Sequence, residues 1–475
     1  MSQAGLTGAG TANIGLMRSK NSKRARGLTL AAMSLGFGVV QLDITIVNTA
    51  LITIAGSLGG AVSDLQWVVN TYTIGFAALI LTAGALGDRV GAKRIFMAGF
   101  ALFTAASLAC AMAPDSTILI AARAVQGIGA AVLVPNSLAL LNHAYPEERQ
   151  RGWAVGIWAA GASLALTAGP LAGGGLIALV GWRSIFLVNL PIGLLGMLLT
   201  WRYANETPRV PARTIDVAGQ VLVIGALGCV AGAVIEAGTL GWRNRWVLVG
   251  FAAFAVLASG FLINERRALQ PMLPLELFKR RMFTLTSMVG LLANAAFYGL
   301  IFVLSLYFQQ IQGRSPLRTG LAFLPLMGMV LPMNLLAARI AQRWGAPATI
   351  ATGAVIAAVG CLTLIGIGPM SAYRDLCAQL IAIGAGLGLL VPPLTSALLG
   401  SVEKARSGLA AGVLNSTRQT GSVLGVALFG SLVAQKTEFM VGVRISLIIS
   451  AVLFSFAAAA ISMGAYAKSE AEMKN

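Results

Sequence analysis

A carboxylate and a guanidinium, which could form an ion pair, stand inside long apolar runs. Asp43 lies within the run 28–55, while Arg123 and Gln126 lie three residues apart within the run 117–141 and so share a helix face. A charge in an apolar medium is costly unless it faces protein or water and finds a partner. Asp43 is the one carboxylate near the middle of such a run. It is therefore the expected ionic partner of Arg123.

Two interpretations of this pair stay open. A permanent salt bridge would only hold two helices together. Alternatively, the carboxylate exchanges the arginine for a proton during a conformational cycle, because burial disfavours a charged carboxylate and a nearby cation favours it.

Further polar side chains within the runs could line a cavity. Gln41, Thr45 and Asn48 recur at helical spacing, which also suits hydrogen bonds between helices. Arg418 either bonds Asn415 and backbone carbonyls or attracts an anionic or zwitterionic group of a substrate. The other candidates for the cavity wall are Gln126, Asn136, Asn294, Tyr298, Tyr307, Asn334, Asn415 and Gln419.

The elements that position these residues are predicted to be membrane-spanning helices. Of 475 residues, 57% are hydrophobic and 11% charged, and the mean hydropathy is +0.82. Soluble domains have about a quarter of their residues charged, so a soluble enzyme is excluded. Fourteen runs approach the roughly 20 residues that span a bilayer. They are 28–55, 65–86, 93–113, 117–141, 151–180, 185–203, 215–236, 246–264, 282–309, 318–340, 347–368, 374–400, 407–433 and 442–466.

The charges indicate orientation rather than a nucleic-acid partner. The chain has 34 Lys and Arg against 16 Asp and Glu. The basic residues of the loops fall roughly three to one on the side of both termini, which predicts cytoplasmic termini. The four cysteines and His143 lack the spacing of a metal site, and no Gly-Lys pair of an ATP-binding loop occurs. We expect no metal and no cofactor, and a carrier rather than an enzyme.

The link between the second and third runs carries glycines and charges at fixed spacing. Glycines permit a tight turn, and an acid at a helix end can pair with the cations. This segment resembles the signature loop of the major facilitator superfamily, and 339–345 resembles a decayed copy. The family uses the loop for conformational gating, which here implies Gly84, Gly87, Asp88, Arg89, Gly91, Lys93 and Arg94.

The resemblance implies an all-α integral membrane protein with the major facilitator fold. Two six-helix halves and two inserted central helices would together make fourteen transmembrane helices. The predicted organisation is a cytoplasmic tail (1–27), the N-terminal half (28–203), the inserted helices with their loops (204–281), the C-terminal half (282–466) and a second cytoplasmic tail (467–475).

The fifth run has small residues at every fourth position, followed by a Gly-Pro-x-x-Gly-Gly ending. Small residues let helices approach closely, and a proline bends a helix. The ending resembles the antiporter motif of drug exporters in this superfamily. The residues concerned are Gly161, Ala165, Gly169, Pro170, Gly173 and Gly174.

Segments 42–51, 181–191 and 415–421 are similar to the fourteen-span drug:proton antiporter family. In that family an acid in the first span and an arginine in the fourth are implicated in proton coupling, which here implies Asp43 and Arg123. Many exporters of dicationic drugs carry another acid in the C-terminal half. No run within 282–466 has one in its interior, so dicationic substrates are not expected.

The expected function is proton-coupled efflux of lipophilic drugs or antibiotics across the cytoplasmic, or inner, membrane by alternating access. Its partners would be a small lipophilic substrate, protons and membrane lipid. A periplasmic adaptor protein is a further possible partner, for which the sequence contains no signal. The alternatives are a carrier for one endogenous metabolite on the same fold and a non-transporting membrane sensor or assembly protein.

Overall fold

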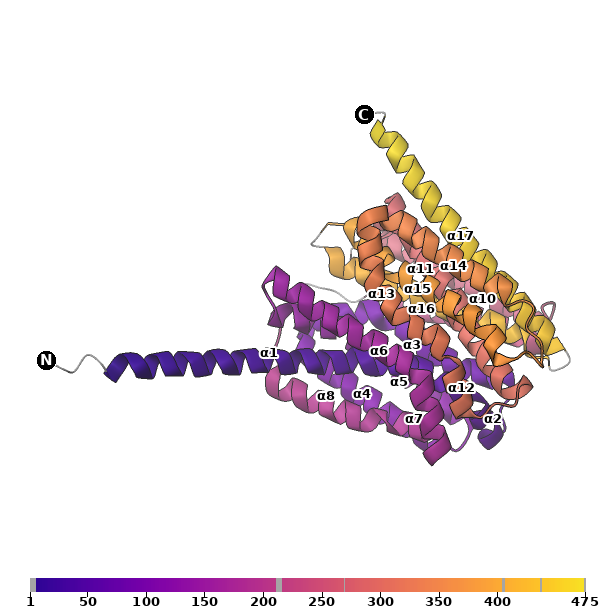
Figure 1. Ribbon diagram of the computed structural model, residues 1–475, viewed down its shortest axis with the longest axis horizontal. Coiled ribbons are helices and arrows are strands. Elements are labelled where there is room, and N and C mark those ends of the chain that lie inside the picture. Colours follow the sequence, from indigo (N-terminus) through magenta and orange to yellow (C-terminus); the bar gives the residue numbers. More distant parts are fainter. Residues whose placement is uncertain (1–5, 211–215, 269, 404–405, 436–437, 474–475) are drawn as a thin grey trace.

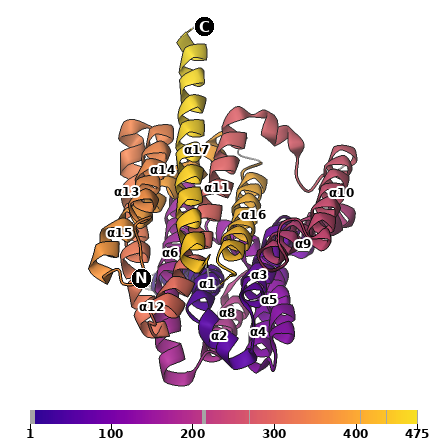
Figure 2. The same cartoon turned by 90° about the vertical axis from the view of Figure 1, so that its right-hand side faces the viewer.

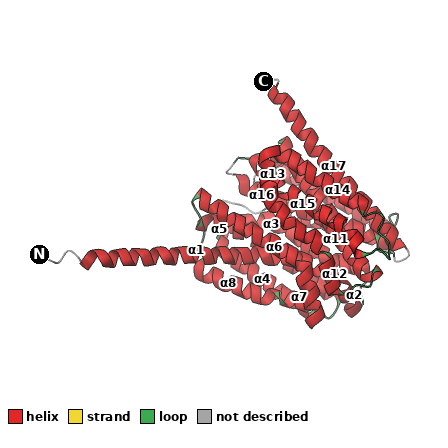
Figure 3. Cartoon of the chain, in the orientation of Figure 1, coloured by secondary structure: helices red, strands yellow, loops and turns green. Residues whose placement is uncertain are grey.

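The chain is helical and contains no strand in the part that the structure describes (Figure 3). The structure is a computed structural model, and it describes residues 6–210, 216–268, 270–403, 406–435 and 438–473. Parts of both predicted tails and of the predicted central segment therefore lie outside the described residues.

In the part of the chain that the structure describes, twenty helical elements follow one another, of which η1 and η2 are 3₁₀-helices and η3 is a π-helix. In chain order they are α1 (Leu6–Ile46), η1 (Val47–Thr49), α2 (Leu51–Leu58), α3 (Val62–Val90), α4 (Ala92–Met112), α5 (Ser116–Ala144), α6 (Glu148–Val180), α7 (Ser184–Leu187), α8 (Asn189–Tyr203), α9 (Val217–Leu240), α10 (Arg245–Arg267), η2 (Leu275–Lys279), α11 (Arg281–Leu306), η3 (Tyr307–Ile311), α12 (Pro316–Ala322), α13 (Leu324–Trp344), α14 (Ala346–Thr363), α15 (Tyr373–Gly400), α16 (Ser407–Leu432) and α17 (Phe439–Met473).

The fourteen predicted runs all correspond to long helical segments. Within the described residues, thirteen segments are long and apolar enough to cross a membrane. The fourteenth is α16, whose 26 residues have the length but include the polar stretch 415–420. Polar side chains are costly against lipid, so this stretch is expected to face protein or an internal cavity.

Three predicted runs are interrupted. The sixth is broken at Val188, between α7 and α8, and the other two are broken where side chains or prolines compete with the helical hydrogen bonds. The first run breaks after Ile46, where Thr49 Oγ1 donates to Ile46 O at 2.8 Å and Asn48 Nδ2 donates to Ile44 O at 3.0 Å. The tenth run breaks at Phe323, because Pro325 has no N–H to donate to the preceding turn.

The helices form two groups that lie next to each other in the bundle (Figure 1). In the first group, α3 and α4 pack against α5, while α6 and α8 pack against α1. In the second, α11 packs against α16, α14 against α15, and α17 against both α14 and α11. The groups contact each other where α16 meets α3 and where α12 meets α6.

The inserted helices α9 and α10 lie at the edge of the bundle (Figure 2). Helix α9 contacts both groups, since its Leu227 and Ala231 pack with Ile74 of α3 and Val423 of α16. Helix α10 packs against α9, and side chains such as Val256 on its other face are exposed, as suits contact with lipid. The pair therefore covers the junction between α3 and α16.

Two sides of the bundle are distinguished by the chain ends. We call the side from which α1 and α17 project the terminus side, and the side carrying α2, α7 and α12 the opposite side (Figure 1).

Candidate functional site

Asp43 of α1 and Arg123 of α5 form a fully buried ion pair. Arg123 Nη1 donates to Asp43 Oδ2, and the side chains are 1% and 0% exposed. The partner predicted from the sequence is therefore confirmed. Burying two charges is costly unless hydrogen bonds satisfy their remaining atoms.

Neighbouring helices supply those hydrogen bonds. Asp43 Oδ1 accepts from Gln126 Nε2 at 2.8 Å and from Asn189 Nδ2 at 3.0 Å. Arg123 Nη1 also donates to Gln126 Oε1 at 2.7 Å, and its Nε donates to Val68 O at 3.1 Å. The arginine therefore keeps neutral acceptors that do not depend on the carboxylate.

The rest of the cluster comes from three further helices. Ser107 Oγ of α4 accepts from Gln126 at 2.8 Å and from Asn189 of α8 at 3.3 Å. The guanidinium carbon of Arg123 lies 4.2 Å from the ring centroid of Tyr72 on α3. Such a cation–π contact stabilises a buried arginine whether or not a carboxylate is charged.

Ser107 and Asn189 are functional candidates that the sequence interpretation missed. Asn189 belongs to the stretch 181–191, which resembles the family, so a signal for it existed. Ser107 is one hydroxyl in an apolar run, and nothing in the sequence distinguishes it.

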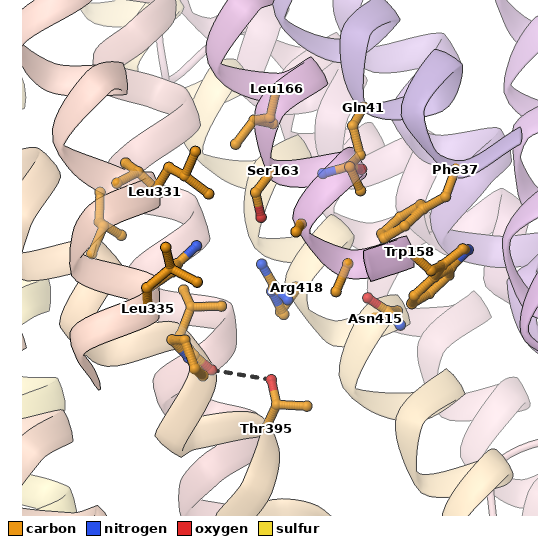
Figure 4. A pocket seen from close by; sticks show the side chains of 18 of the residues that line it. Phe37, Gln41, Trp158, Ser163, Leu166, Leu331, Leu335, Thr395, Asn415 and Arg418 are labelled. Atoms are coloured by element: carbon orange, nitrogen blue, oxygen red, sulfur yellow. Dashed lines mark hydrogen bonds between the residues drawn. The ribbon is translucent and has the colours of Figure 1, made fainter. Parts of the chain in front are cut away.

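A cavity of about 470 Å³ lies between the two groups, beside this cluster on α1. Its wall comes from α1, α6, α11, α13, α15 and α16 (Figure 4). Half of the twelve predicted wall residues line it, namely Gln41, Asn294, Tyr298, Asn334, Asn415 and Arg418. Two residues of the polar stretch of α16, Asn415 and Arg418, thus face this cavity.

Three predicted wall residues are instead bonded within helix junctions. Thr45 Oγ1 donates to Leu166 O of α6 at 3.0 Å, and the buried Asn48 side chain donates to Ile44 O at the end of α1. Tyr307 donates to Gly368 O at 2.7 Å. The prediction that these residues line the cavity is wrong, because helical spacing does not tell a cavity face from a helix contact.

The three remaining predictions are also corrected. Gln126 belongs to the ion-pair cluster, and Gln419 is 7% exposed and lies off the cavity wall. Asn136 donates to Val132 O at 2.8 Å and lines a different cavity, described below.

Apolar side chains, which the sequence interpretation did not assign, make much of the wall. Phe37 of α1 and Trp158 of α6 stack with ring centroids 4.2 Å apart. Leu166, Leu331 and Leu335 add aliphatic surface (Figure 4). An apolar wall with a few polar groups is typical of sites for small lipophilic molecules. Apolar residues are common in every span, so no sequence signal marked these.

A second cavity of about 410 Å³ lies toward the terminus side. It runs between α3 and α5 of the first group and α16 of the second, with Asp88, Asn142 and Arg406 in its wall. Trp158 and Asn415 line both cavities. The two groups are thus separated by cavities on the terminus side.

On the opposite side the groups pack closely through backbone contacts. A side-chain carbon at Gly174 of α6 would lie 2.6 Å from Pro316 O of α12, and one at Gly320 of α12 would overlap Pro170 O of α6. Real side-chain carbons do not approach backbone this closely, so α6 and α12 touch only because these positions are glycines. The central cavity is closed on this side.

The small residues of the predicted antiporter motif divide between two partner helices. Gly161 and Ala165 lie at ordinary van der Waals distance from Ser34 and Gly38 of α1. Gly169 and Gly173 pack more tightly, against Thr45 and Ile46 of the same helix. Pro170 and Gly174 contact α12. The motif therefore joins the helix that carries Asp43 to the junction between the two groups.

The predicted gating loop joins α3 to α4 on the terminus side. Gly91 has a φ of 113°, which favours glycine, and Gly87 leaves the space that the Asn136 side chain of α5 occupies. Gly84 and Asp88 line the second cavity, while the side chains of Arg89 and Arg94 are exposed.

A linker segment, residues 204–210, packs against this loop, which the sequence did not predict. Glu206 accepts from Lys93 N at 2.8 Å and Arg94 N at 3.3 Å, and Val210 N donates to Asp88 O at 2.8 Å. Lys93 Nζ donates to Ala204 O at 2.8 Å. The carboxylate thus caps the first turn of α4 from another part of the chain.

Replacing Glu206 with Ala is expected to loosen this turn. A lost cap costs about 1 kcal/mol, so amide exchange over residues 92–94 should become roughly fivefold faster. Hydrogen exchange read by mass spectrometry measures this. Glu403→Ala is the matched control, because that carboxylate is 67% exposed and, among the described residues, pairs with the side chain of Arg280 at the surface. Equal exchange in both variants would contradict the capping role.

Comparison with known proteins places this geometry in a family. The sequence profile described as Major Facilitator Superfamily matches residues 33–426. The methylenomycin A resistance protein of Streptomyces coelicolor is 37% identical over 420 residues, which cover 88% of each chain. The multidrug resistance protein Stp of Mycobacterium tuberculosis is 37% identical over 414 residues, 86% of this chain and 76% of that one.

A solved structure shares the fold. A peptide transporter, POT, superposes with a TM-score of 0.66 over 92% of this chain and 95% of that chain, at 16% sequence identity. The profile match, the relatives and the shared fold agree with the two helix groups and the cavity between them. The chain is a multi-pass membrane protein and belongs to the major facilitator superfamily.

Proposed function

We propose that this protein exports lipophilic drugs or antibiotics across the cytoplasmic membrane in exchange for protons. The observation that carries the proposal is a largely apolar cavity between two helix groups, next to a buried Asp43–Arg123 pair on a shared helix. The resistance proteins among the relatives support the class of cargo.

The bias of basic loop residues supports cytoplasmic termini. With that orientation, the terminus side faces the cytoplasm and this conformation is open inward. Cargo enters from the cytoplasm or the inner leaflet between the two groups. No ATP and no catalysis are required, because a proton gradient supplies the free energy.

Helix α1 connects proton binding to cargo movement. Gln41 lies on the cavity wall, Asp43 in the ion pair, and Thr45 against α6. In the outward-open state the carboxylate takes a proton as cargo leaves. Arg123 then rests on Gln126, Val68 O and the Tyr72 ring, and it pairs with Asp43 again when the proton is released inward.

The test uses purified protein in liposomes with an imposed pH gradient and a panel of fluorescent lipophilic compounds. We expect several unrelated compounds to move against their own gradients, each movement ceasing when an ionophore removes the pH gradient. Transport of a single compound, competed only by its close analogues, would instead indicate a metabolite carrier. No movement of any compound would refute the proposal.

A further inference from the structure

The central cavity contains a cation that has no partner among the residues that the structure describes. Arg418 of α16 is half-buried and points into the cavity (Figure 4). Within the described residues its guanidinium takes part in no hydrogen bond or ion pair, and no Asp or Glu lines the cavity. The phenol of Tyr298 lines the same cavity and interacts electrostatically with Arg418.

The surroundings of Arg418 differ from those of Arg123, the other arginine inside a predicted span. Arg123 has a carboxylate, an amide oxygen, a backbone carbonyl and an aromatic face. A cation in an apolar cavity without such partners favours binding of an anion, because little water competes for its charge.

The neighbouring amides leave the guanidinium as a principal donor in the cavity. Asn294 Nδ2 already donates to Gly290 O at 2.8 Å, and Asn415 Nδ2 donates to Ala411 O at 3.1 Å. Each of these amide nitrogens therefore has one of its two N–H groups already bonded within its own helix, whereas all five N–H groups of the guanidinium are available to a ligand. An arginine fork binds a carboxylate or sulfonate through two parallel hydrogen bonds, which suits this position.

We propose that the cargo of this protein carries an anionic group on an apolar body and that Arg418 binds the anionic group. Phe37 and Trp158 on one side and Leu331 and Leu335 on the other then contact the apolar body (Figure 4). The inference rests on the proposed function, since it names the chemical class of the cargo.

The test compares two probes that differ by one charge. Dansyl-6-aminohexanoate and its carboxamide share the same apolar body, and only the first is an anion at pH 7.4. Equilibrium dialysis against the protein in nanodiscs, with empty nanodiscs subtracted, gives each Kd. We expect the carboxylate to bind at least about tenfold more tightly than the carboxamide, as a charge-assisted hydrogen bond predicts.

Arg418→Gln is expected to abolish this preference while leaving carboxamide binding within about twofold. Arg343→Gln, which removes an exposed arginine from the end of α13, should leave the preference unchanged. Equal binding of both probes by the wild-type protein would overturn the inference. A preference that survives in Arg418→Gln would overturn it as well, since another group would then bind the anion.

A measurement on the wild-type protein covers the case in which Arg418→Gln fails to fold. Phenylglyoxal modifies arginines, and peptide mass spectrometry reports the rate at Arg418. With the carboxylate probe at ten times its Kd, modification should slow about tenfold, and the carboxamide should give less protection. Equal protection by both probes would refute anion binding at this residue.

These readouts are separate from the proposed function. Equilibrium dialysis and protection from phenylglyoxal need no pH gradient, so their results do not depend on whether the protein transports anything. If the neutral carboxamide is transported by the pH gradient but the carboxylate gains nothing from Arg418, the export function stands and the inference about cargo charge fails.

Discussion

Asp43→Asn is expected to reduce pH-gradient-driven transport to the level of protein-free liposomes. The amide keeps the shape of the carboxylate and can still accept from Gln126 and Asn189, but it neither binds nor releases a proton. Cargo binding should change by no more than about twofold, because Asp43 is fully buried and lies off the cavity wall. If the variant loses proton-coupled transport but still binds cargo, Asp43 acts in proton exchange and does not serve a purely structural role.

The measurement follows external fluorescent cargo and internal pH in the same liposomes. Wild-type protein should move protons when cargo is added, and Asp43→Asn should move none. Asp115→Asn is the matched control, since this exposed acid caps α5 through Ile118 N at 2.8 Å and Asn caps equally well. It should transport like the wild type.

The stability of Asp43→Asn needs its own control. Removing one partner of a buried ion pair costs about 3–5 kcal/mol, since Arg123 is then buried without a counter-charge. The double variant Asp43→Asn with Arg123→Gln removes both charges, and we expect it to unfold near the wild-type temperature while remaining unable to couple. Proton-driven transport by either variant would show that the coupling site lies elsewhere.

The spans and the ion pair could be predicted from the sequence because both obey strong rules. A bilayer demands long apolar runs, and a buried charge demands a partner. Helix α16 is instructive, because the sequence predicts it as a span although it is less apolar than the other thirteen. Two residues of its polar stretch, Asn415 and Arg418, supply polar groups to the cavity wall.

The cavity wall could be predicted only in part. Gln41 and Thr45 stand on the same predicted stripe of α1, yet one faces the cavity and the other donates to α6. Which of the two faces the cavity depends on how the neighbouring helices are rotated about their axes, and this rotation cannot be predicted from a single sequence. The linker at Glu206 was missed for a similar reason, since its contacts with α4 join residues more than a hundred positions apart.

The close packing of α6 on α12 predicts a second large effect. Gly320→Ala places a carbon on Pro170 O, and Gly174→Ala places one 2.6 Å from Pro316 O. Both obstacles are backbone atoms, so no side chain can move aside. Forced packing of this kind costs about 1–3 kcal/mol. The cost falls only on the conformation in which the opposite side is closed, because the contact joins the two helix groups.

Each variant should therefore shift the population toward the state that is open on the opposite side by roughly 5- to 150-fold, as the cost of the clash implies. A carrier must pass through both states, so the transport rate should fall about tenfold or more. Spin labels at Leu179 of α6 and Leu321 of α12, both exposed, report the separation in a background without the four cysteines. We expect the labels to lie farther apart in Gly320→Ala than in the parent.

Two neighbouring glycines provide matched controls. Gly175 follows Gly174 in α6, and Gly328 lies eight residues after Gly320 in α13, yet a side-chain carbon at either position meets nothing within 4 Å. Gly175→Ala and Gly328→Ala should transport and report label distances like the parent. If Gly320→Ala matches these controls, the α6–α12 contact does not restrict the opening of the opposite side. If it transports poorly but the label distance is unchanged, the glycine serves local folding instead of the conformational equilibrium.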